Sequence, residues 1–299
     1  LQESNQGHKD FQSFALPTEL RHQLHKCGCK YIFIFIIRQK KNYKKWFCKF
    51  IVFKISMNLV IDVGNSLVKL AVFEDTKIIY KKAVQLDFIL KHVDLLRKEF
   101  KNINKTIISS VGKLKNSDIT YLNKNFDLVL LNKTTELPFK NCYETPNTLG
   151  MDRVALVSAA VQQYPKSNVL IIDAGTCITY DFVSDKNEYL GGAISPGIRM
   201  RYQSLNNLTA KLPLLETKEP KNIIGNSTNN SIHSGVVYGV LKEIEGVIDA
   251  YSLNYKDLTV ILTGGDTNFL SKQLKSSIFA NSNFLLEGLN FILEFNTNE

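Results

Sequence analysis

The amino-acid sequence predicts an α/β protein with two duplicated lobes, each built on a mixed five-stranded sheet flanked by helices. A buried strand, a turn that starts with Asp and two further strands occur in this order twice, at 59–84 and at 169–190. Helical patterns with apolar residues three and four apart follow in both halves. This repeated opening indicates an internal duplication despite little residue identity. The expected lobes are residues 57–165 and 166–299.

The first lobe is expected to have the order βββαβαβ. Its first strand is an apolar run that stops at Asp62, and the next two strands are joined by a hairpin turn at 74–76. Recurrence of apolar residues predicts a helix at 88–100, and a shorter helix is expected at 117–123. The expected strands lie at 59–63, 68–73, 77–84, 106–111 and 128–131.

The second lobe is expected to repeat this theme with longer helices. A fully apolar strand ends at Asp173, and one apolar stripe runs along the helix predicted at 231–251. Further helices are predicted at 153–164 and 284–295. The expected strands lie at 169–172, 178–183, 188–190 and 258–262.

Residues 1–56 differ from the rest in composition. They hold 11 Lys and Arg against 3 Asp and Glu, and so carry +8 of the formal net charge of +9. The basic, aromatic stretch 38–54 is compatible with nucleic-acid or membrane binding, and Cys27 and Cys29 with His22 and His25 are compatible with a metal site. The cysteine spacing lacks a second half, however, and the apolar run 31–37 is far shorter than the roughly 20 residues of a membrane helix. We expect 1–56 to be non-native or disordered, with Met57 as the true start.

The remaining residues are nearly neutral in charge and contain only two cysteines, Cys142 and Cys177. Two cysteines give no disulfide framework, which favours a reducing cytoplasm. A near-neutral charge argues against direct nucleic-acid binding, which usually needs a basic face. We expect neither nucleic acid nor a membrane as a partner.

Glycine-rich turns in a fixed order are the strongest functional signal. Two of them begin with Asp at the end of an apolar strand. Such a turn places a carboxylate beside backbone N–H groups that bind phosphate oxygens, and the carboxylate can hold an accompanying metal. A single such turn is more often an ordinary hairpin, but two in separate halves indicate two lobes that close on a nucleotide. The turns are Asp62-Val-Gly-Asn-Ser66, Gly150-Met-Asp-Arg153, Asp173-Ala-Gly-Thr176, Gly191-Gly-Ala-Ile-Ser-Pro-Gly197 and Thr263-Gly-Gly-Asp266.

With these turns, three further segments carry a family resemblance: Tyr143-Glu-Thr-Pro-Asn-Thr-Leu-Gly150, Gly225-Asn-Ser-Thr228 and Leu286-Glu-Gly-Leu289. The two lobes resemble the ribonuclease-H-like, actin-like ATPase lobes of the superfamily of acetate and sugar kinases, heat-shock chaperones and actin. Within it, residues 57–299 resemble type III pantothenate kinase. The segment through Arg153 distinguishes this family from other members of the superfamily.

The resemblance implies ATP-dependent phosphorylation of pantothenate to 4'-phosphopantothenate, the first step of coenzyme A biosynthesis. It also implies a divalent cation such as Mg²⁺ with ATP, and a monovalent cation, K⁺ or NH₄⁺. Members of the family are generally homodimers, with the pantothenate site near the subunit interface.

The residues expected to bind ATP come from the two Asp turns. Asp62 would serve the metal–phosphate unit, and the backbone that follows it, with Lys69, would hold phosphate oxygens. Ser66 stands where the family usually has Thr and keeps the hydroxyl. Asp173 matches the family's ligand for the monovalent cation. The full ATP-binding set is Asp62, Val63, Gly64, Asn65, Ser66, Leu67, Val68, Lys69 and Thr176.

The residues expected to bind the substrate surround a predicted general base, Asp152. This residue lies where Gly150 opens a helix, a position that favours the ionised carboxylate. Arg153 offers a forked donor set suited to the pantothenate carboxylate. The full substrate-binding set is Tyr143, Gly150, Met151, Asp152, Arg153 and Thr228.

Three other functions remain open on the sequence. A non-catalytic regulatory relative is disfavoured by the presence of both Asp152 and Asp173. A kinase of another small hydroxy acid would have similar motifs. A chaperone-like ATPase would need a separate peptide-binding domain, for which the chain has no room after the final predicted helix.

Overall fold

A computed structural model describes residues 36–37, 48–49, 56–64, 67–109 and 114–297. The chain divides into two compact units, residues 1–56 and 57–299. In the first unit, the described residues form two short antiparallel strands, β1 (Ile36–Ile37) and β2 (Cys48–Lys49). The predictions for Cys27, Cys29, the histidines and the apolar run at 31–35 lie outside the described residues. The division of 57–299 at residue 165 stays a prediction.

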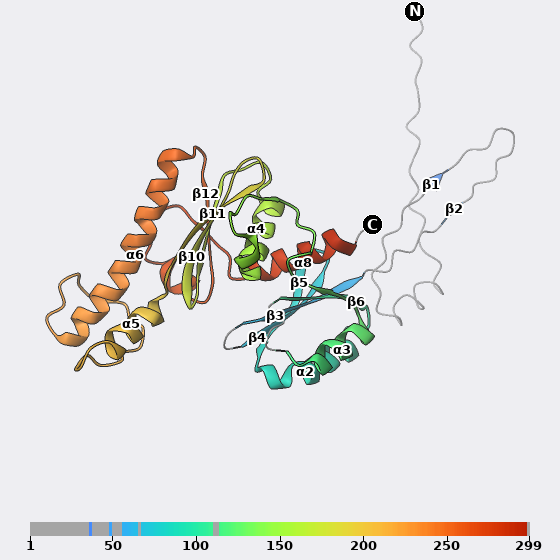
Figure 1. The fold of residues 1–299 in the computed structure, drawn as a ribbon, viewed down its shortest axis with the longest axis horizontal. Coiled ribbons are helices and arrows are strands. Elements are labelled where there is room, and N and C mark those ends of the chain that lie inside the picture. The colour runs from blue at the N-terminus through green and yellow to red at the C-terminus, as the bar shows by residue number, and fades with distance from the viewer. Residues whose placement is uncertain (1–35, 38–47, 50–55, 65–66, 110–113, 298–299) are drawn as a thin grey trace, which may run out of the picture. The chain divides into compact units, whose positions relative to one another are not determined.

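The first sheet of the second unit has the five strands that the sequence predicted, and their order in the sheet is β5-β4-β3-β6-β7 (Figure 1). β3 pairs antiparallel with β4 and parallel with β6, so the sheet is mixed. The apolar runs of β3 and β4 are buried almost throughout, which explains why their pattern was easy to recognise. The strands are β3 (Met57–Val63), β4 (Val68–Glu74), β5 (Lys77–Val84), β6 (Ile103–Ser109) and β7 (Asp127–Leu130).

Helices cover one face of this sheet (Figure 1). They are α2 (Ile89–Glu99), which follows the short helix η1 (Leu86–Phe88), and α3 (Asn116–Asn125). Their buried side chains, such as Val93 and Leu122, form one apolar cluster with side chains of β3 and β4. Burial of this face stabilises the lobe through the hydrophobic effect.

Among the described residues, the second sheet has six strands, in the order β13-β12-β9-β10-β11-β8, against five expected from the fold class and four located by the residue pattern. The difference arises at the sheet edges, where β8 and β13 are only two residues long and therefore carry no recognisable pattern. The strands are β8 (Lys140–Asn141), β9 (Val169–Ala174), β10 (Cys177–Val183), β11 (Glu188–Pro196), β12 (Thr259–Thr263) and β13 (Phe279–Ala280).

The prediction of a glycine turn at 191–197 was wrong for most of that segment. β11 continues to Pro196 and pairs with β10 along its length. A Cβ on Gly192 would lie 1.6 Å from the carbonyl oxygen of Tyr180. Glycine is therefore required here for the close approach of two strands, and only Gly197 begins a new element.

The helices of this half are η3 (Pro146–Thr148), α4 (Met151–Gln163), α5 (Ile198–Asn207), α6 (Thr228–Asn254), α7 (Thr267–Leu270) and α8 (Phe284–Thr297). α6 begins three residues before the predicted helix because the Ser227 side chain accepts a hydrogen bond from the N–H of Asn230 and caps it. α5 and α6 pack together on one face of the second sheet, in a cluster that includes Tyr202 and Val240.

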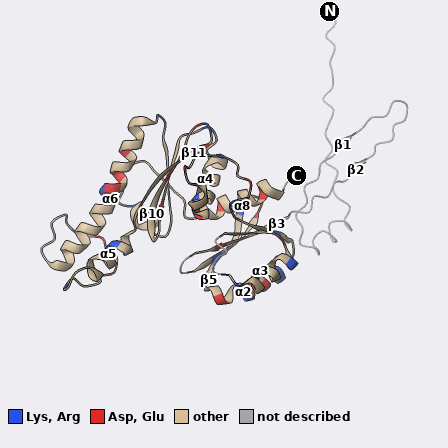
Figure 2. Cartoon of the chain, viewed as in Figure 1, with Lys and Arg blue, Asp and Glu red and all other residues tan. Residues whose placement is uncertain are grey.

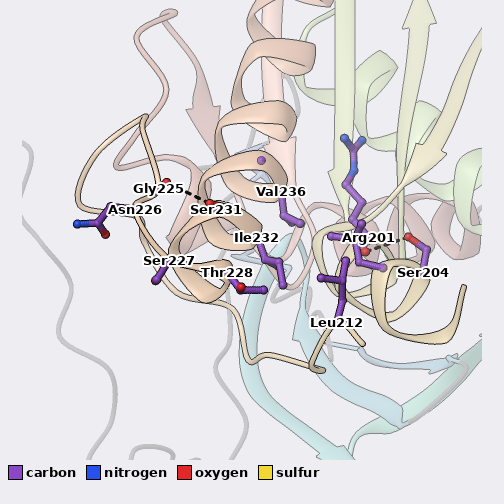
Figure 3. A pocket seen from close by; sticks show the side chains of 12 residues that line it. Arg201, Ser204, Leu212, Gly225, Asn226, Ser227, Thr228, Ser231, Ile232 and Val236 are labelled. Atoms are coloured by element: carbon purple, nitrogen blue, oxygen red, sulfur yellow. Dashed lines mark hydrogen bonds between the residues drawn. The ribbon is translucent and has the colours of Figure 1, made fainter. Parts of the chain in front are cut away.

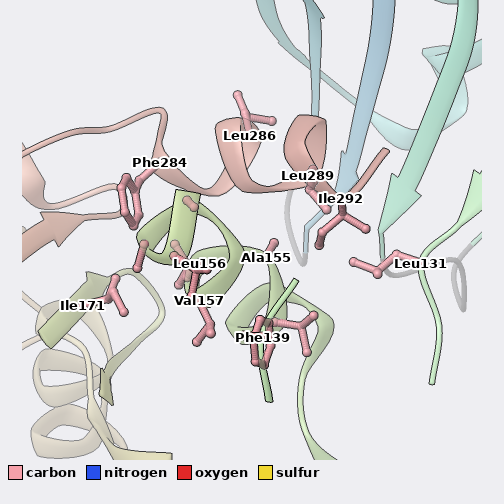
Figure 4. Close-up of a cluster of buried hydrophobic side chains, with 14 of the residues drawn as sticks. Leu131, Phe139, Ala155, Leu156, Val157, Ile171, Phe284, Leu286, Leu289 and Ile292 are labelled. Atoms are coloured by element: carbon pink, nitrogen blue, oxygen red, sulfur yellow. The ribbon is translucent and has the colours of Figure 1, made fainter. Parts of the chain in front are cut away.

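Helices α4 and α8 pack against each other and join one apolar cluster that contains side chains from both sheets (Figure 4). Ile107 comes from the first sheet and Ile171 from the second, while Leu156 of α4 and Leu289 of α8 complete the cluster. A Cβ on Gly288 would lie 1.8 Å from the carbonyl oxygen of Ala155. The glycine of the Leu286–Leu289 motif therefore lets the two helices touch.

Acidic and basic residues are interspersed along α2, whereas the charged residues of α6 are mostly acidic (Figure 2). Among the described residues, no helix combines the length and the apolar character needed to cross a membrane.

Candidate active site

Asp62 lies at the end of β3, next to Lys69 of β4 and Ser109 of β6 in the strand register. Its side chain is buried, with 6% of the residue exposed. The Ser109 hydroxyl donates a 2.7 Å hydrogen bond to Oδ1, and Nζ of Lys69 lies 3.8 Å from Oδ2. The carboxylate is thus oriented from both sides, while the half-exposed Lys69 can still move toward a ligand.

The turn after Asp62 is tight. The N–H of Gly64 donates to the carbonyl of Leu67, and a Cβ on Gly64 would lie 2.9 Å from that oxygen. Val63 and Val68 are core residues, so any contact that they make with a ligand would come from their backbone. Leu67 is exposed. The predictions for Asn65 and Ser66 lie outside the described residues.

Asp173 is the penultimate residue of β9, and two backbone segments, at Gly197 and at Gly264, approach the turn that follows the strand. The N–H of Gly197 donates to the Thr176 carbonyl, where a Cβ on Gly197 would lie only 2.4 Å from that oxygen. A Cβ on Gly264, whose φ is +97°, would lie 2.4 Å from Oδ1 of Asp173. Gly197 and Gly264 thus allow their backbone segments to approach the second Asp turn itself.

Arg201 of α5 secures the end of β11 beside this turn. Its Nε donates to the Pro196 carbonyl at 2.9 Å, and its Nη2 donates to the Ser195 hydroxyl and pairs with Glu243 of α6. Partial burial raises the pKa of Glu243, but the hydrogen bonds that its carboxylate accepts lower it more. The pKa of this carboxyl therefore lies below its usual value. This cluster fixes the position from which Gly197 reaches Thr176.

Charged groups from both sheets act on Asp173. Burial raises the pKa of Asp173, Lys69 lowers it and the negative charges of Asp152, Asp181 and Asp62 raise it, with a net value of about 6. Four carboxylates therefore act on one another across this region. A negative site of this kind favours a bound cation, and its oxygen ligands suit Mg²⁺ or K⁺.

Within the described parts of the chain, no three His, Cys, Asp or Glu side chains lie close enough together to coordinate an ion. A cation held by Asp62 or Asp173 would therefore take its other ligands from backbone carbonyls, water or the phosphates of a nucleotide.

Asp152 lies exposed in the first turn of α4, where the helix dipole favours a negative charge. Its Oδ1 accepts a 2.8 Å hydrogen bond from the N–H of Arg153. A Cβ on Gly150 would lie 2.3 Å from that oxygen, so glycine is required for this orientation of the carboxylate.

The side chain of Arg153 is buried, not open to solvent as a substrate fork would suggest. Its Nε donates to Oδ1 of Asp181 at 2.7 Å, and Nη2 lies 2.7 Å from the same oxygen. Tyr143, stacked on Tyr189 with 5.8 Å between ring centroids, lies over the guanidinium at 5.4 Å. The structure thus brings Tyr143, Gly150, Met151, Asp152 and Arg153 to one end of α4.

Thr228 lies elsewhere, at the N-terminus of α6. It lines a cavity of about 930 Å³ between α5 and α6, with Arg201, Gly225 and Ser231 among the other lining residues (Figure 3). No residue of the 143–153 segment lines this cavity.

Sequence reasoning missed Ser109, Asp181 and Tyr189. Asp181 had a usable signal, because a carboxylate inside the otherwise apolar run 178–183 demands a buried partner. Ser109 had none, since its place opposite Asp62 depends on the strand register.

Comparison with known proteins places the chain in a family. A family model described as type III pantothenate kinase matches residues 58–250. A type III pantothenate kinase from Christiangramia forsetii is 52% identical over 240 residues, which are 80% of this chain and 99% of the relative. One from Flavobacterium johnsoniae is 46% identical over 78% of this chain and 96% of the relative.

Solved structures support the fold. A conserved Campylobacter jejuni protein assigned to a Baf family of transcriptional activators is 22% identical and covers 81% of this chain and all of its own, with a TM-score of 0.54. At this identity the likeness concerns the fold alone. The long, nearly complete matches to curated relatives show that this chain belongs to the type III pantothenate kinase family.

Proposed function

We propose that this protein transfers the γ-phosphoryl group of ATP to the primary hydroxyl of pantothenate and thereby begins coenzyme A synthesis in the cytoplasm. A bond forms between the hydroxyl oxygen and the γ-phosphorus, the bond from that phosphorus to ADP breaks, and the hydroxyl proton leaves. The observation that carries the proposal is the grouping of Asp62, Lys69, Asp152 and Asp173 in one electrostatic neighbourhood.

The nucleotide phosphates are proposed to bind between the two Asp turns. Lys69 can reach phosphate oxygens because its side chain is half exposed, and Thr176 contributes from the turn that Gly197 and Gly264 hold. Asp62 would hold the divalent cation, directly or through water, and Asp173 the monovalent one. These cations neutralise phosphate charge when bound.

Asp152 is proposed to orient the acceptor hydroxyl and take its proton. Its position in the first helical turn and its hydrogen bond from Arg153 favour the ionised form and fix one oxygen. Nε of Arg153 donates to Asp181 and Nη2 forms an ion pair with the same oxygen, but the buried Nη2 has no hydrogen-bond partner among the described residues. Any contact with the pantothenate carboxylate therefore falls to Nη2 and the rest of the guanidinium.

A homodimer is the proposed assembly. Large apolar side chains are exposed beside the cavity that contains Thr228, among them Leu208, Ile223 and Ile224, at 83%, 69% and 81% exposure. A second copy of the chain covering them would explain how Thr228, distant in sequence from the 143–153 segment, contributes to a pantothenate site.

The test is pantothenate-dependent ADP release by the purified chain with ATP and Mg²⁺, in buffers containing K⁺, NH₄⁺ or Na⁺. We expect turnover that requires pantothenate and is higher with K⁺ or NH₄⁺ than with Na⁺. Asp152→Asn should lower kcat by about 10²-fold or more while unfolding at the wild-type temperature. Asp118→Asn, in the first turn of α3, is the matched control and should retain full activity.

A folded, ATP-binding protein without pantothenate turnover would contradict the proposal. Turnover with another hydroxy acid would then identify a kinase of different acceptor. Unchanged turnover in Asp152→Asn would remove Asp152 from its role.

A further inference from the structure

Asp181 is a completely buried carboxylate in the middle of β10. Its Oδ1 accepts hydrogen bonds from Nε of Arg153 and from the Tyr189 hydroxyl, both at 2.7 Å. Its Oδ2 accepts one from the Thr179 hydroxyl at 3.1 Å. The two carboxylate oxygens are therefore both satisfied, and the strongest bonds converge on one of them.

The planar guanidinium of Arg153 is contacted on its faces as well as along one edge. The guanidinium carbon lies 5.4 Å from the Tyr143 ring centroid and 5.9 Å from that of Tyr189, within the range of cation–π attraction. Tyr143 can lie there because residue 191 is glycine: it has a φ of +108°, and its missing Cβ would stand 3.3 Å from the Tyr143 ring. Ring faces and a carboxylate thus fix the guanidinium in one orientation.

Fold stability alone does not require such a buried pair. Removing two charges from water costs several kcal/mol, and replacement of a buried ion pair by apolar residues is often neutral or stabilising. Burial raises the pKa of Asp181, which its hydrogen bonds only partly offset. The free-energy cost of burying the Arg153–Asp181 pair is better explained by the part of the structure that the pair holds in place.

The pair holds the start of α4. Arg153 follows Asp152 directly, and its own N–H donates the 2.8 Å hydrogen bond that Oδ1 of Asp152 accepts. A shift of the Arg153 side chain would therefore move the backbone group that orients the proposed base. The N-cap residue Gly150 makes no side-chain capping hydrogen bond, so the Arg153–Asp181 pair supplies a polar anchor at this end of α4.

We propose that Asp181 and Tyr189 are positioning residues that fix Arg153 and, through its N–H, the carboxylate of Asp152. The inference rests on the proposed kinase function. Asp181 touches neither substrate nor reacting atoms in this role. It acts from inside the second sheet on the geometry of the base. Its charge also acts on Asp173, so the deciding variant is one that keeps this charge.

The sharpest test is Tyr189→Phe, which removes one hydroxyl from Asp181 and keeps the ring. Tyr202→Phe is the matched control, because Tyr202 is equally buried and its hydroxyl bonds to Nδ1 of His233, away from α4. We expect Tyr189→Phe to lower kcat about five-fold with an unchanged KM for ATP, and Tyr202→Phe to leave both parameters unchanged. The two variants should unfold at similar temperatures.

A second variant, Asp181→Asn, keeps the side-chain volume and one acceptor oxygen but removes the charge. We expect kcat to fall about 10²-fold, as for a misplacement of about 1 Å in an active site. If this variant does not fold, Tyr189→Phe still decides the question. Equal kcat in Tyr189→Phe and Tyr202→Phe would overturn the proposal. A loss of kcat/KM for ATP that comes entirely from a higher KM would overturn it as well.

Hydrogen–deuterium exchange of the segment 150–156 gives a readout that does not depend on turnover. Tyr189→Phe should speed exchange in this segment, and Tyr202→Phe should not. If the wild-type chain lacks pantothenate turnover, the proposed function fails, and the exchange data alone decide the positioning role. Equal exchange in both variants would then overturn it.

Discussion

The hydroxyl of Ser109 donates a 2.7 Å hydrogen bond to Oδ1 of Asp62, across the parallel pair β6 and β3. Lys69 approaches the other oxygen from β4, on the opposite side of β3. The carboxylate proposed to serve the metal–phosphate unit is thus oriented by both neighbouring strands before any ligand arrives, which lowers the cost of ordering it on binding.

Ser109→Ala should therefore lower kcat/KM for ATP by about ten-fold, because a hydrogen bond to a charged group contributes about 1.5–3 kcal/mol. Steady-state kinetics with varied ATP measures the effect. Thr106→Val on the same strand is the control. The Thr106 hydroxyl is buried and has no hydrogen-bond partner among the described residues, so its removal should leave kinetics unchanged and stability equal or higher. Equal kinetics in the two variants would contradict the role of Ser109.

Gly150→Ala should reduce turnover without reducing stability. The added methyl would stand 2.3 Å from Oδ1 of Asp152, the end of a flexible side chain that can swing away at little cost. The carboxylate would then lose its orientation, and we expect kcat to fall at least ten-fold. Gly246→Ala in α6, where a Cβ meets nothing within 4 Å, is the control and should raise stability by about 0.5–1 kcal/mol. Full activity in Gly150→Ala would show that the orientation of Asp152 is unimportant.

Gly264→Ala should destabilise the fold and disturb Asp173 together. The residue has a φ of +97°, and its Cβ would clash with the Ala174 carbonyl as well as with Asp173. We expect a loss of at least about 2 kcal/mol in the free energy of unfolding, measured in urea. At Gly265 a Cβ would meet nothing within 4 Å, so Gly265→Ala should change stability by less than about 1 kcal/mol. Similar losses in both variants would sink this interpretation.

Glu243→Gln should make the protein less stable at neutral pH but not in acid. The pKa of Glu243 is lowered in the fold, so its contribution is present above the unfolded pKa, near 4.3, and is lost as the pH falls through the folded value. We expect a deficit of about 1 kcal/mol at pH 7 that closes below about pH 4, measured by urea unfolding. Glu219→Gln, at an exposed carboxylate, should match wild type at both pH values. A deficit that persists in acid would point to packing instead of charge.

The sequence predicted the elements whose side chains alternate or recur strongly. β3, β9 and α6 were recognisable because apolar runs or stripes there match the core that they form. α5 was missed because only Ile198 and Tyr202 are buried along it. The strand at 191–196 was mistaken for a turn because the sequence does not show whether a glycine serves a turn or a close approach.

The residues of the candidate site also fall into a group that the sequence identified and a group that it did not. Motif residues such as Asp62, Asp152 and Asp173 were identified because their backbone context is local. Ser109, Tyr189 and Asp181 were not, because their partners are remote in sequence. Strand pairing brings Ser109 to Asp62 and Tyr189 near Asp181, and the packing of α4 on β10 brings Asp181 to Arg153. Prediction of such partners requires the register, which the residue pattern does not determine uniquely.

The packing of α8 onto α4 has a consequence for synthesis on the ribosome. About 120 residues separate the end of α4 from the start of α8, so at roughly 5–20 residues per second the apolar face of α4 waits about 6–24 s for its partner. The first sheet has emerged by then, but its face toward α4 and α8 has no cover either. The apolar face of α4 therefore stays without its partner helix until late in translation, when Gly288 can pack against Ala155.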